Sequence, residues 1–138
     1  MAMQDYRSSG KAEVLGQSVE SISLTKHGKV LGMCPQYNSI FEQLTVTENL
    51  YFMGRIKGLS SGDIEKNSEI ILKTLELEEF RHVVSDKLSG GNKRKLSCAL
   101  TLMLCPKVLY MDEPTTGVDP VSRRSLFKMI KSIKNHSG

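Results

Sequence analysis

The sequence predicts an α/β fold in which a parallel sheet carries an inserted group of helices. Three features lead to this prediction. The apolar stretch 108–111 shows no alternation with polar residues, which is typical of a parallel strand buried on both faces. The stretch 37–88 has apolar residues at helical spacing and follows an earlier predicted strand. The length of 138 residues fits one domain or most of one.

The N-terminal part of the chain contains the first predicted strands. Residues 12–15 form a short predicted strand that ends at Gly16. Residues 19–24 alternate apolar and polar side chains, but a short helix fits them as well, so both possibilities stay open. Residues 29–34 predict a strand, and Pro35 ends it because proline has no N–H for the ladder.

Two helices are predicted within the insertion. Thr45 and Glu48 match a capping box at the start of the first helix, and Gly58 marks its expected end. The second helix is expected to run from Ser61 to Leu77. In both helices apolar residues at helical spacing are expected to face the core: Leu50, Met53 and Ile56 in the first, and Ile64, Ile71, Leu72 and Leu75 in the second.

The last third of the chain predicts a helix, a strand and a helix. The helix is expected over 89–104, and Pro106 breaks it. After the strand 108–111, Asp119 and Pro120 are a suitable N-cap and first-position pair for a last helix. The residues expected to face the core are Leu96, Ala99, Leu100 and Met103 in the earlier helix, and Val121, Leu126, Met129, Ile130 and Ile133 in the last.

The charge balance does not favour a nucleic-acid partner. The net charge is +4, from 19 basic and 15 acidic side chains, which is only a mild excess. The basic residues are scattered apart from 93–95 and 123–124, and no aromatic residues alternate with them. We interpret Lys93, Arg94 and Lys95 as a solvated face of a helix. The three histidines show no metal-ligand spacing and are expected at the surface: His27, His82 and His136.

Cysteine usage and hydropathy set the expected compartment. Cys34, Cys98 and Cys105 are odd in number and show no C-x-x-C spacing, so we expect buried free thiols in a reducing compartment. No stretch approaches the ~18 apolar residues of a membrane span, and the polar residues 1–11 do not resemble a signal peptide. We expect a soluble segment whose membrane association comes through a partner or through further chain.

Ser89, Gly90 and Gly91 are candidates for binding a phosphate. They stand at the start of a predicted helix, where unpaired N–H groups and the positive end of the helix dipole attract anions. The two glycines allow a phosphate to approach the backbone closely. For these three residues alone, an ordinary helix start would be the simpler interpretation.

Asp112 and Glu113 are candidates for phosphoryl-transfer chemistry. They follow directly on the apolar strand 108–111. Phosphoryl transfer needs Mg²⁺ at the phosphate oxygens and a group that orients the attacking water, and two carboxylates at one strand end can serve both needs. A solvated turn is the alternative, but the apolar run before the acids and Pro114–Asp119 after them disfavour it.

These motifs together resemble those of a known family. The segment 88–97, LSGGNKRKLS, and the segment 108–114, VLYMDEP, look like the signature motif and the Walker B motif of ATP-binding-cassette (ABC) ATPase domains. Asn92, where many relatives carry glutamine or glutamate, is most similar to the A subfamily. The resemblance implies a P-loop NTPase fold, ATP and Mg²⁺ as cofactors, and a second ABC ATPase domain as partner in a head-to-tail dimer.

The resemblance also implies roles for the candidate residues. Ser89, Gly90 and Gly91 would hold the γ-phosphate of ATP bound to the opposite subunit. Asp112 would lie in the Mg²⁺ shell through water, and Glu113 would be the catalytic base.

Two further residues match loops of the same family. Gln36, after Pro35, resembles the Q-loop glutamine, which contacts Mg²⁺ and the attacking water and couples the site to the helical subdomain. Asp119 matches the D-loop, which crosses the dimer interface near the other active site; its N-cap role can hold at the same time.

Three motifs of the family have no counterpart in these 138 residues. A P-loop (Walker A) requires G-x-x-x-x-G-K-[ST], but Gly10 and Lys11 are followed by Ala12, and Asp5 stands where the first glycine would. No aromatic A-loop residue is in place, since Tyr6 is wrongly positioned. His136 precedes the position of the H-loop histidine.

We therefore expect a partial ABC ATPase domain over residues 1–138. Residues 37–104 are expected to form the helical and signature subdomain, and residues 9–36 and 105–138 are expected to belong to the catalytic core.

The functional hypothesis is an ATP-binding and ATP-hydrolysing domain of an ABC transporter on the cytoplasmic face of a membrane. It would work with transmembrane domains of the same transporter and drive the movement of a lipid or amphiphile. The isolated chain is expected to be inactive because it lacks Walker A. One alternative is a non-catalytic truncated paralogue, or pairing module, that completes a partner's ATP site in trans. A soluble ABC ATPase of translation or chromosome maintenance is a third hypothesis.

Overall fold

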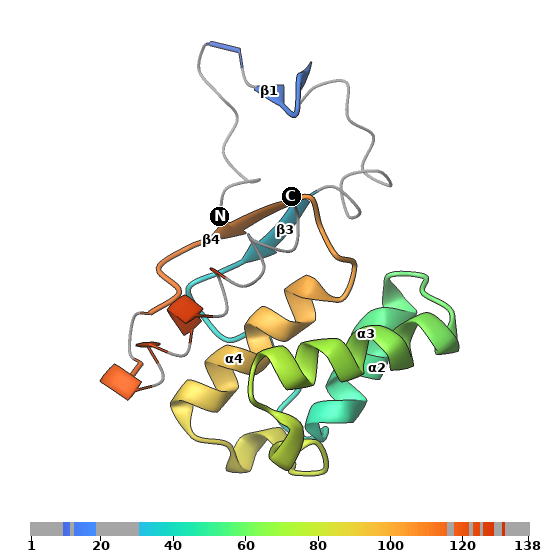
Figure 1. The fold of residues 1–138 in the computed structure, drawn as a ribbon, viewed down its shortest axis with the longest axis vertical. Helices are drawn as coiled ribbons and strands as arrows, with labels where there is room; N and C mark the ends of the chain where they lie inside the picture. Colours follow the sequence, from blue (N-terminus) through green and yellow to red (C-terminus); the bar gives the residue numbers. More distant parts are fainter. Residues whose placement is uncertain are drawn as a thin grey trace.

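The computed structural model describes residues 10–11, 13–18, 31–115, 118–121, 123–124, 126–128 and 131. At its centre β3 (Leu31–Cys34) and β4 (Val108–Met111) pair in parallel, with Leu31 opposite Val108 and Cys34 opposite Met111. The helices between these strands in sequence lie together on one side of the pair (Figure 1). The predicted α/β class with a parallel sheet and an inserted helical group is confirmed.

The burial predicted for the second of these strands is only partly correct. In β4 three side chains are half-buried, but Tyr110 is 59% exposed. Parallel strands are buried on both faces only when both faces of the sheet are covered. Among the described residues, α4 packs against this sheet, and its face at Tyr110 is open to solvent.

A separate two-stranded hairpin precedes the parallel pair. β1 (Glu13–Val14) pairs antiparallel with β2 (Gln17–Ser18). Leu15 and Gly16 between them have φ values of 51° and 74°, the positive values of a two-residue turn that matches the strand twist. The strand predicted over 12–15 and its end at Gly16 are thus confirmed in outline. Residues 19–24 lie outside the described residues.

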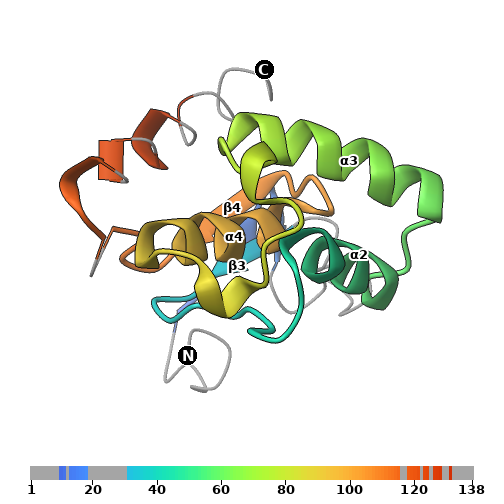
Figure 2. The same ribbon diagram turned by 90° about the horizontal axis from the view of Figure 1, so that it is seen from below.

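Three helices form the body beside the parallel strands: α2 (Val46–Ile56), α3 (Ser61–Thr74) and α4 (Gly90–Leu102). Figure 2 shows α4 crossing β3 and β4, with α2 and α3 to one side of it. The capping box of Thr45 and Glu48 is present at the start of α2, and Gly58 follows its end with φ of 79°.

The apolar residues expected to face the core mostly do so. Leu50, Leu72, Leu75, Leu96, Ala99 and Met103 are each no more than 1% exposed. Ile56, however, is 63% exposed, although Gly54 in the same turn of α2 is buried. Gly54 takes the inward place instead and lets α2 approach Ile64 of α3 closely.

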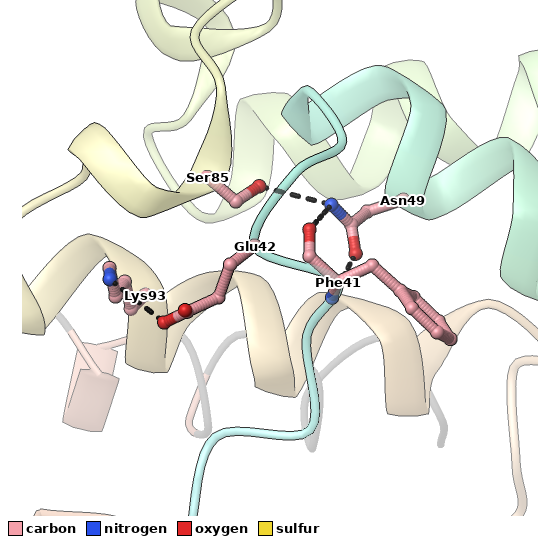
Figure 3. Close-up of polar contacts among 5 residues, drawn as sticks. All are labelled: Phe41, Glu42, Asn49, Ser85 and Lys93. Atoms are coloured by element: carbon pink, nitrogen blue, oxygen red, sulfur yellow. Dashed lines mark hydrogen bonds and ion pairs between the residues drawn. The ribbon is translucent and has the colours of Figure 1, made fainter.

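Two short 3-10 turns, η1 (Glu78–Phe80) and η2 (Ser85–Lys87), connect α3 to α4. The fully buried Asn49 joins η2 to the segment before α2 (Figure 3). Its Oδ1 accepts from the Phe41 N–H at 2.9 Å, and its Nδ2 donates to the Phe41 carbonyl at 2.9 Å and to Ser85 Oγ at 3.0 Å. This side chain therefore ties the loop between β3 and α2 to η2.

The described residues after β4 agree with the predicted last helix at its start. Residues 120 and 121 are helical, and Asp119 Oδ1 accepts from the Val121 N–H at 3.0 Å. Leu126 is fully buried as expected, but Val121 is 77% exposed. It belongs to the first turn of the helix, where Asp119 and Pro120 are exposed as well. Met129, Ile130 and Ile133 lie outside the described part.

Candidate functional site

The carboxyl ends of β3 and β4 bring two predicted site residues into contact. The Asp112 N–H donates to the Cys34 carbonyl at 2.9 Å, so the parallel pairing continues to the point where both strands end. Directly beyond it, Gln36 Nε2 donates to Glu113 Oε2 at 3.0 Å. These two residues are 77 positions apart in the chain, and parallel strand pairing is what places them together.

The backbone at Glu113 is in an uncommon conformation. Its φ is 41°, in the left-handed region that few residues other than glycine adopt. Such a conformation costs on the order of 1–3 kcal/mol and is found often at functional sites. The side chains of Asp112 and Glu113 are both exposed, so these two carboxylates are open to a ligand from outside.

The start of α4 offers backbone donors. Ser89 is the N-cap, and its Oγ accepts from the Asn92 N–H at 3.3 Å, which leaves the hydroxyl proton of Ser89 free to donate elsewhere. The N–H groups of Gly90 and Gly91 belong to the first turn, where no intrahelical acceptor exists. A Cβ added to Gly90 would meet nothing within 4 Å. The open side of this glycine is therefore available to a partner from outside the chain.

The prediction that residues 93–95 form a solvated face of a helix is wrong for Arg94. It is 2% exposed, and its guanidinium donates to the carbonyls of Pro35 and Gln36 on one loop and of Asp112 and Pro114 on the other. The sequence alone does not reveal this, because a helix buries whichever side faces its neighbours, and here the sheet ends supply carbonyl acceptors at that side.

The two lysines beside Arg94 are also less exposed than predicted. Lys93 Nζ lies 3.2 Å from Glu42 Oε1, the ion pair drawn in Figure 3. Lys95 is 7% exposed, and its Nζ lies 3.5 Å from Glu76 Oε2. Both lysines thus lie against neighbouring acids of the helical part, which leaves little of the run for a nucleic-acid backbone.

A buried thiol pair lies beneath the site. Cys34 Sγ and Cys98 Sγ are 3.5 Å apart, and both residues are at most 1% exposed. The hydrogen bond from Cys98, with the nearby charge of Arg94, lowers the pKa of Cys34 to about 6, and the same contact and burial raise the pKa of Cys98. Cys105 is exposed with φ of 47°, so the prediction of burial is wrong for it; it lies in the turn after α4.

The remaining predicted residue, Asp119, lies at the start of the last helix, and its exposed side chain caps that helix. A surface groove of about 370 Å³ lies apart from all of these residues, between α2, α3 and the turn at 81–82. His82 lines that groove and is exposed, as predicted; His27 and His136 lie outside the described residues.

The hydrogen-bond donors and oxygen ligands at these positions are of the chemical types that bind a nucleotide phosphate and Mg²⁺. N–H groups at a helix start suit phosphate oxygens, while the exposed Asp112 carboxylate and the Gln36 amide oxygen are the hard oxygen ligands that Mg²⁺ prefers. Mg²⁺ keeps several waters and needs few protein ligands. The described residues contain no group of three or more His, Cys, Asp or Glu side chains that could hold a metal ion.

Comparison with known proteins shows which family and which relatives this chain resembles. The family model described as ABC transporter matches residues 1–116. ABC transporter A family member 5 of Arabidopsis thaliana is 50% identical over 111 residues, covering 78% of this chain and 12% of the plant protein. The human retinal-specific phospholipid-transporting ATPase ABCA4 is 42% identical over 125 residues, covering 91% of this chain and 6% of the human protein.

A mouse protein gives a further match of the same kind. The phospholipid-transporting ATPase ABCA3 of Mus musculus is 42% identical over 127 residues, which cover 92% of this chain and 7% of the mouse protein. The chain thus spans between 6% and 12% of the length of these curated relatives. In the described ranges, none of the helices is both long and apolar enough to cross a bilayer.

Proposed function

Because the chain belongs to the ABC transporter family, we propose that it forms part of the ATP-binding and ATP-hydrolysing domain of an A-subfamily transporter. The parent protein would couple ATP hydrolysis to the movement of a lipid or related amphiphile across a membrane. The similarity to A-subfamily members over most of this chain supports the subfamily, and two of those relatives are named as phospholipid-transporting ATPases.

The observation that carries the proposal is the contact between Gln36 and Glu113. It joins the ends of two parallel strands at 3.0 Å, and each residue matches a catalytic motif of the family. In the proposed reaction Glu113 accepts the proton of the attacking water, and the Gln36 amide orients that carboxylate and the water. Asp112 lies beside them and would hold Mg²⁺ through water, so that the phosphate charge is neutralised when the nucleotide is bound.

The start of α4 would serve a second site across a dimer. Ser89, Gly90 and Gly91 would donate to the γ-phosphate of ATP on the opposite ATPase domain, with Asp119 near the same interface. Residues 37–104 would form the helical and signature subdomain, and residues 9–36 and 105–138 would belong to the catalytic core. Transmembrane domains of the same transporter would be the other partners and would place the domain at the cytoplasmic face.

The test is the substitution Glu113→Gln in the parent transporter reconstituted in phospholipid vesicles. Loss of a general base typically costs 10²–10⁴-fold, so ATP turnover should fall about 100-fold or more while ATP binding persists. The matched control is Glu79→Gln, which alters an exposed carboxylate of η1 and should leave turnover unchanged. Full turnover by the Glu113→Gln transporter, or none by the wild type, would refute the proposal.

A second candidate function follows from one sequence fact. These 138 residues contain no G-x-x-x-x-G-K-[ST], yet the capped helix start at Ser89 is intact. A product consisting of these residues alone would complete a partner's ATP site without hydrolysing ATP itself. Sequencing the transcript on both sides decides between the two: a P-loop and membrane spans support the transporter, and stop codons support the pairing module.

A further inference from the structure

The feature that the motifs do not account for is the buried charge of Arg94. In the described part of the chain its acceptors are all neutral backbone carbonyls. Nε donates to Pro114 at 3.0 Å, Nη1 to Pro35 and Gln36, and Nη2 to Asp112 at 3.1 Å. Burying a cation without a carboxylate partner is costly, so packing alone gives no reason for an arginine at this position.

The geometry of these hydrogen bonds suggests what the arginine does. A guanidinium is planar, and its donors point in fixed directions. The bound carbonyls come from two loops: that of Gln36 itself, and those of the residues on either side of Glu113. A rigid fork between these loops sets the distance between the backbones from which Gln36 and Glu113 project.

Arg94 also connects these loops to the proposed second site. It lies one helical turn after Gly90 and Gly91 in α4. A shift of the helix start would therefore move the same side chain that holds the loops of Gln36 and Glu113.

We propose that Arg94 is a positioning residue that holds Gln36 and Glu113 at their working distance and ties them to the start of α4. The geometric part of this inference stands on its own; its consequence for catalysis rests on the proposed function. Arg94 itself would not touch the nucleotide.

The geometric part is tested on the 138-residue chain by nuclear magnetic resonance of the Gln36 side-chain amide, assigned with a Gln36→Glu variant. Arg94→Lys keeps the charge but loses the planar fork, and Arg94→Gln keeps a planar donor without the charge. Both should shift the Gln36 amide signals toward those seen in Glu113→Ala. The control Lys95→Met removes the neighbouring low-exposure cation, which contacts Glu76 rather than the loops, and should leave the signals in place.

Three results would overturn the geometric part. One is a folded Arg94→Lys or Arg94→Gln chain with unchanged Gln36 signals. Another is an equal shift in Lys95→Met. The third is loss of folding in both Arg94 variants while Lys95→Met folds, which would make Arg94 a stability residue only.

The catalytic part is tested in the parent transporter. Arg94→Lys should lower kcat for ATP about 10- to 100-fold, as expected for misplaced catalytic groups, and leave KM within about threefold, since Arg94 does not bind the nucleotide. A change confined to KM would contradict positioning. Absence of hydrolysis by the wild-type transporter would instead refute the proposed function, and the amide signals of Gln36 would still decide the geometric part.

Discussion

Asn49 shows how one buried side chain can set the path of a loop. It is fully buried, and besides its contacts with Phe41 and Ser85 its Nδ2 lies 3.2 Å from the Leu44 carbonyl and 3.0 Å from the Thr45 carbonyl. The first of the residues it holds, Phe41, lies five positions after Gln36 in the chain. Its amide thus connects the Gln36 loop to the helical part of the molecule.

We expect Asn49→Ala to destabilise the protein by about 1–3 kcal/mol, because the Phe41 N–H loses the acceptor that Asn49 provides. Urea unfolding of wild type and variant measures this loss. Asn38→Ala, at an exposed position in the same loop, is the control and should change stability by less than about 0.5 kcal/mol. Similar unfolding midpoints for the two variants would show that the Asn49 contacts do not hold the loop.

At the scale of elements, the start of α2 is stabilised by a charge that can be titrated. Glu48 Oε2 accepts from the Thr45 N–H at 2.8 Å and from Thr45 Oγ1 at 2.8 Å. These hydrogen bonds lower the pKa of the Glu48 carboxyl below its ordinary value of 4.5. The ionised form is therefore favoured in the folded protein relative to the unfolded chain.

The sign of the resulting pH dependence follows directly. A lowered folded-state pKa stabilises the protein above pH 4.5, and this contribution is lost as the pH falls through the folded-state value. Wild type should be more stable than Glu48→Gln at pH 7, and the difference should shrink on acidification below pH 4.5. The urea unfolding midpoints of wild type and Glu48→Gln, each measured at pH 7 and at a pH below 4.5, give this difference in stability. A difference that stays constant or grows in acid would contradict the capping role.

The packing of α2 on α3 depends on Gly54. A Cβ there would lie 2.6 Å from Ile64 Cγ1 and 2.9 Å from its Cδ1. Gly54→Ala should destabilise the protein by about 1–3 kcal/mol through overpacking, as thermal unfolding would show. Gly62→Ala, where an added Cβ meets nothing within 4 Å, should stabilise by about 0.5–1 kcal/mol. Stabilisation by both changes would mean that the helices can move apart at no cost.

Local signals of the sequence predicted the elements well. The capping box of Thr45, the N-cap of Asp119 and the glycine turns at 16 and 58 each depend on residues within a few positions, and all are present. The apolar periodicity of α3 and α4 was equally informative, because one side of each helix meets a continuous core.

Burial at the edges of the elements could not be predicted in this way. Ile56, Tyr110 and Val121 belong to apolar patterns but are exposed, since their burial depends on which neighbours reach them. Arg94 shows the opposite error: a basic residue is buried because carbonyls from two loops, distant in sequence, converge on it. The contact of Gln36 with Glu113 likewise needed the parallel register, whereas their separate motifs were visible in the sequence.

At the scale of the whole molecule, the proposed function divides the site between two chains. Ser89 and Gly90 at the start of α4 are exposed, and Gly90 leaves its outward side open. A Cβ at position 90 would meet nothing within 4 Å in this chain, so packing within the chain does not require glycine there. In the proposed dimer, glycine at position 90 would serve the opposite domain, because the phosphate bound there would approach the backbone at this point.

Gly90→Ala separates folding from assembly. The added methyl group meets nothing within 4 Å in this chain, so unfolding of the 138-residue protein should be unchanged or stabilised by up to about 1 kcal/mol. In the parent transporter the same methyl group would stand where the partner's phosphate approaches and would hold it away from the N–H donors at the start of α4, so ATP turnover should fall about tenfold or more. Gly62→Ala makes the same chemical change in an equally open place on α3 and should leave turnover intact. If Gly90→Ala folds normally and the transporter keeps full turnover, the start of α4 does not serve a partner's nucleotide, and the division of the site between two chains has to be abandoned.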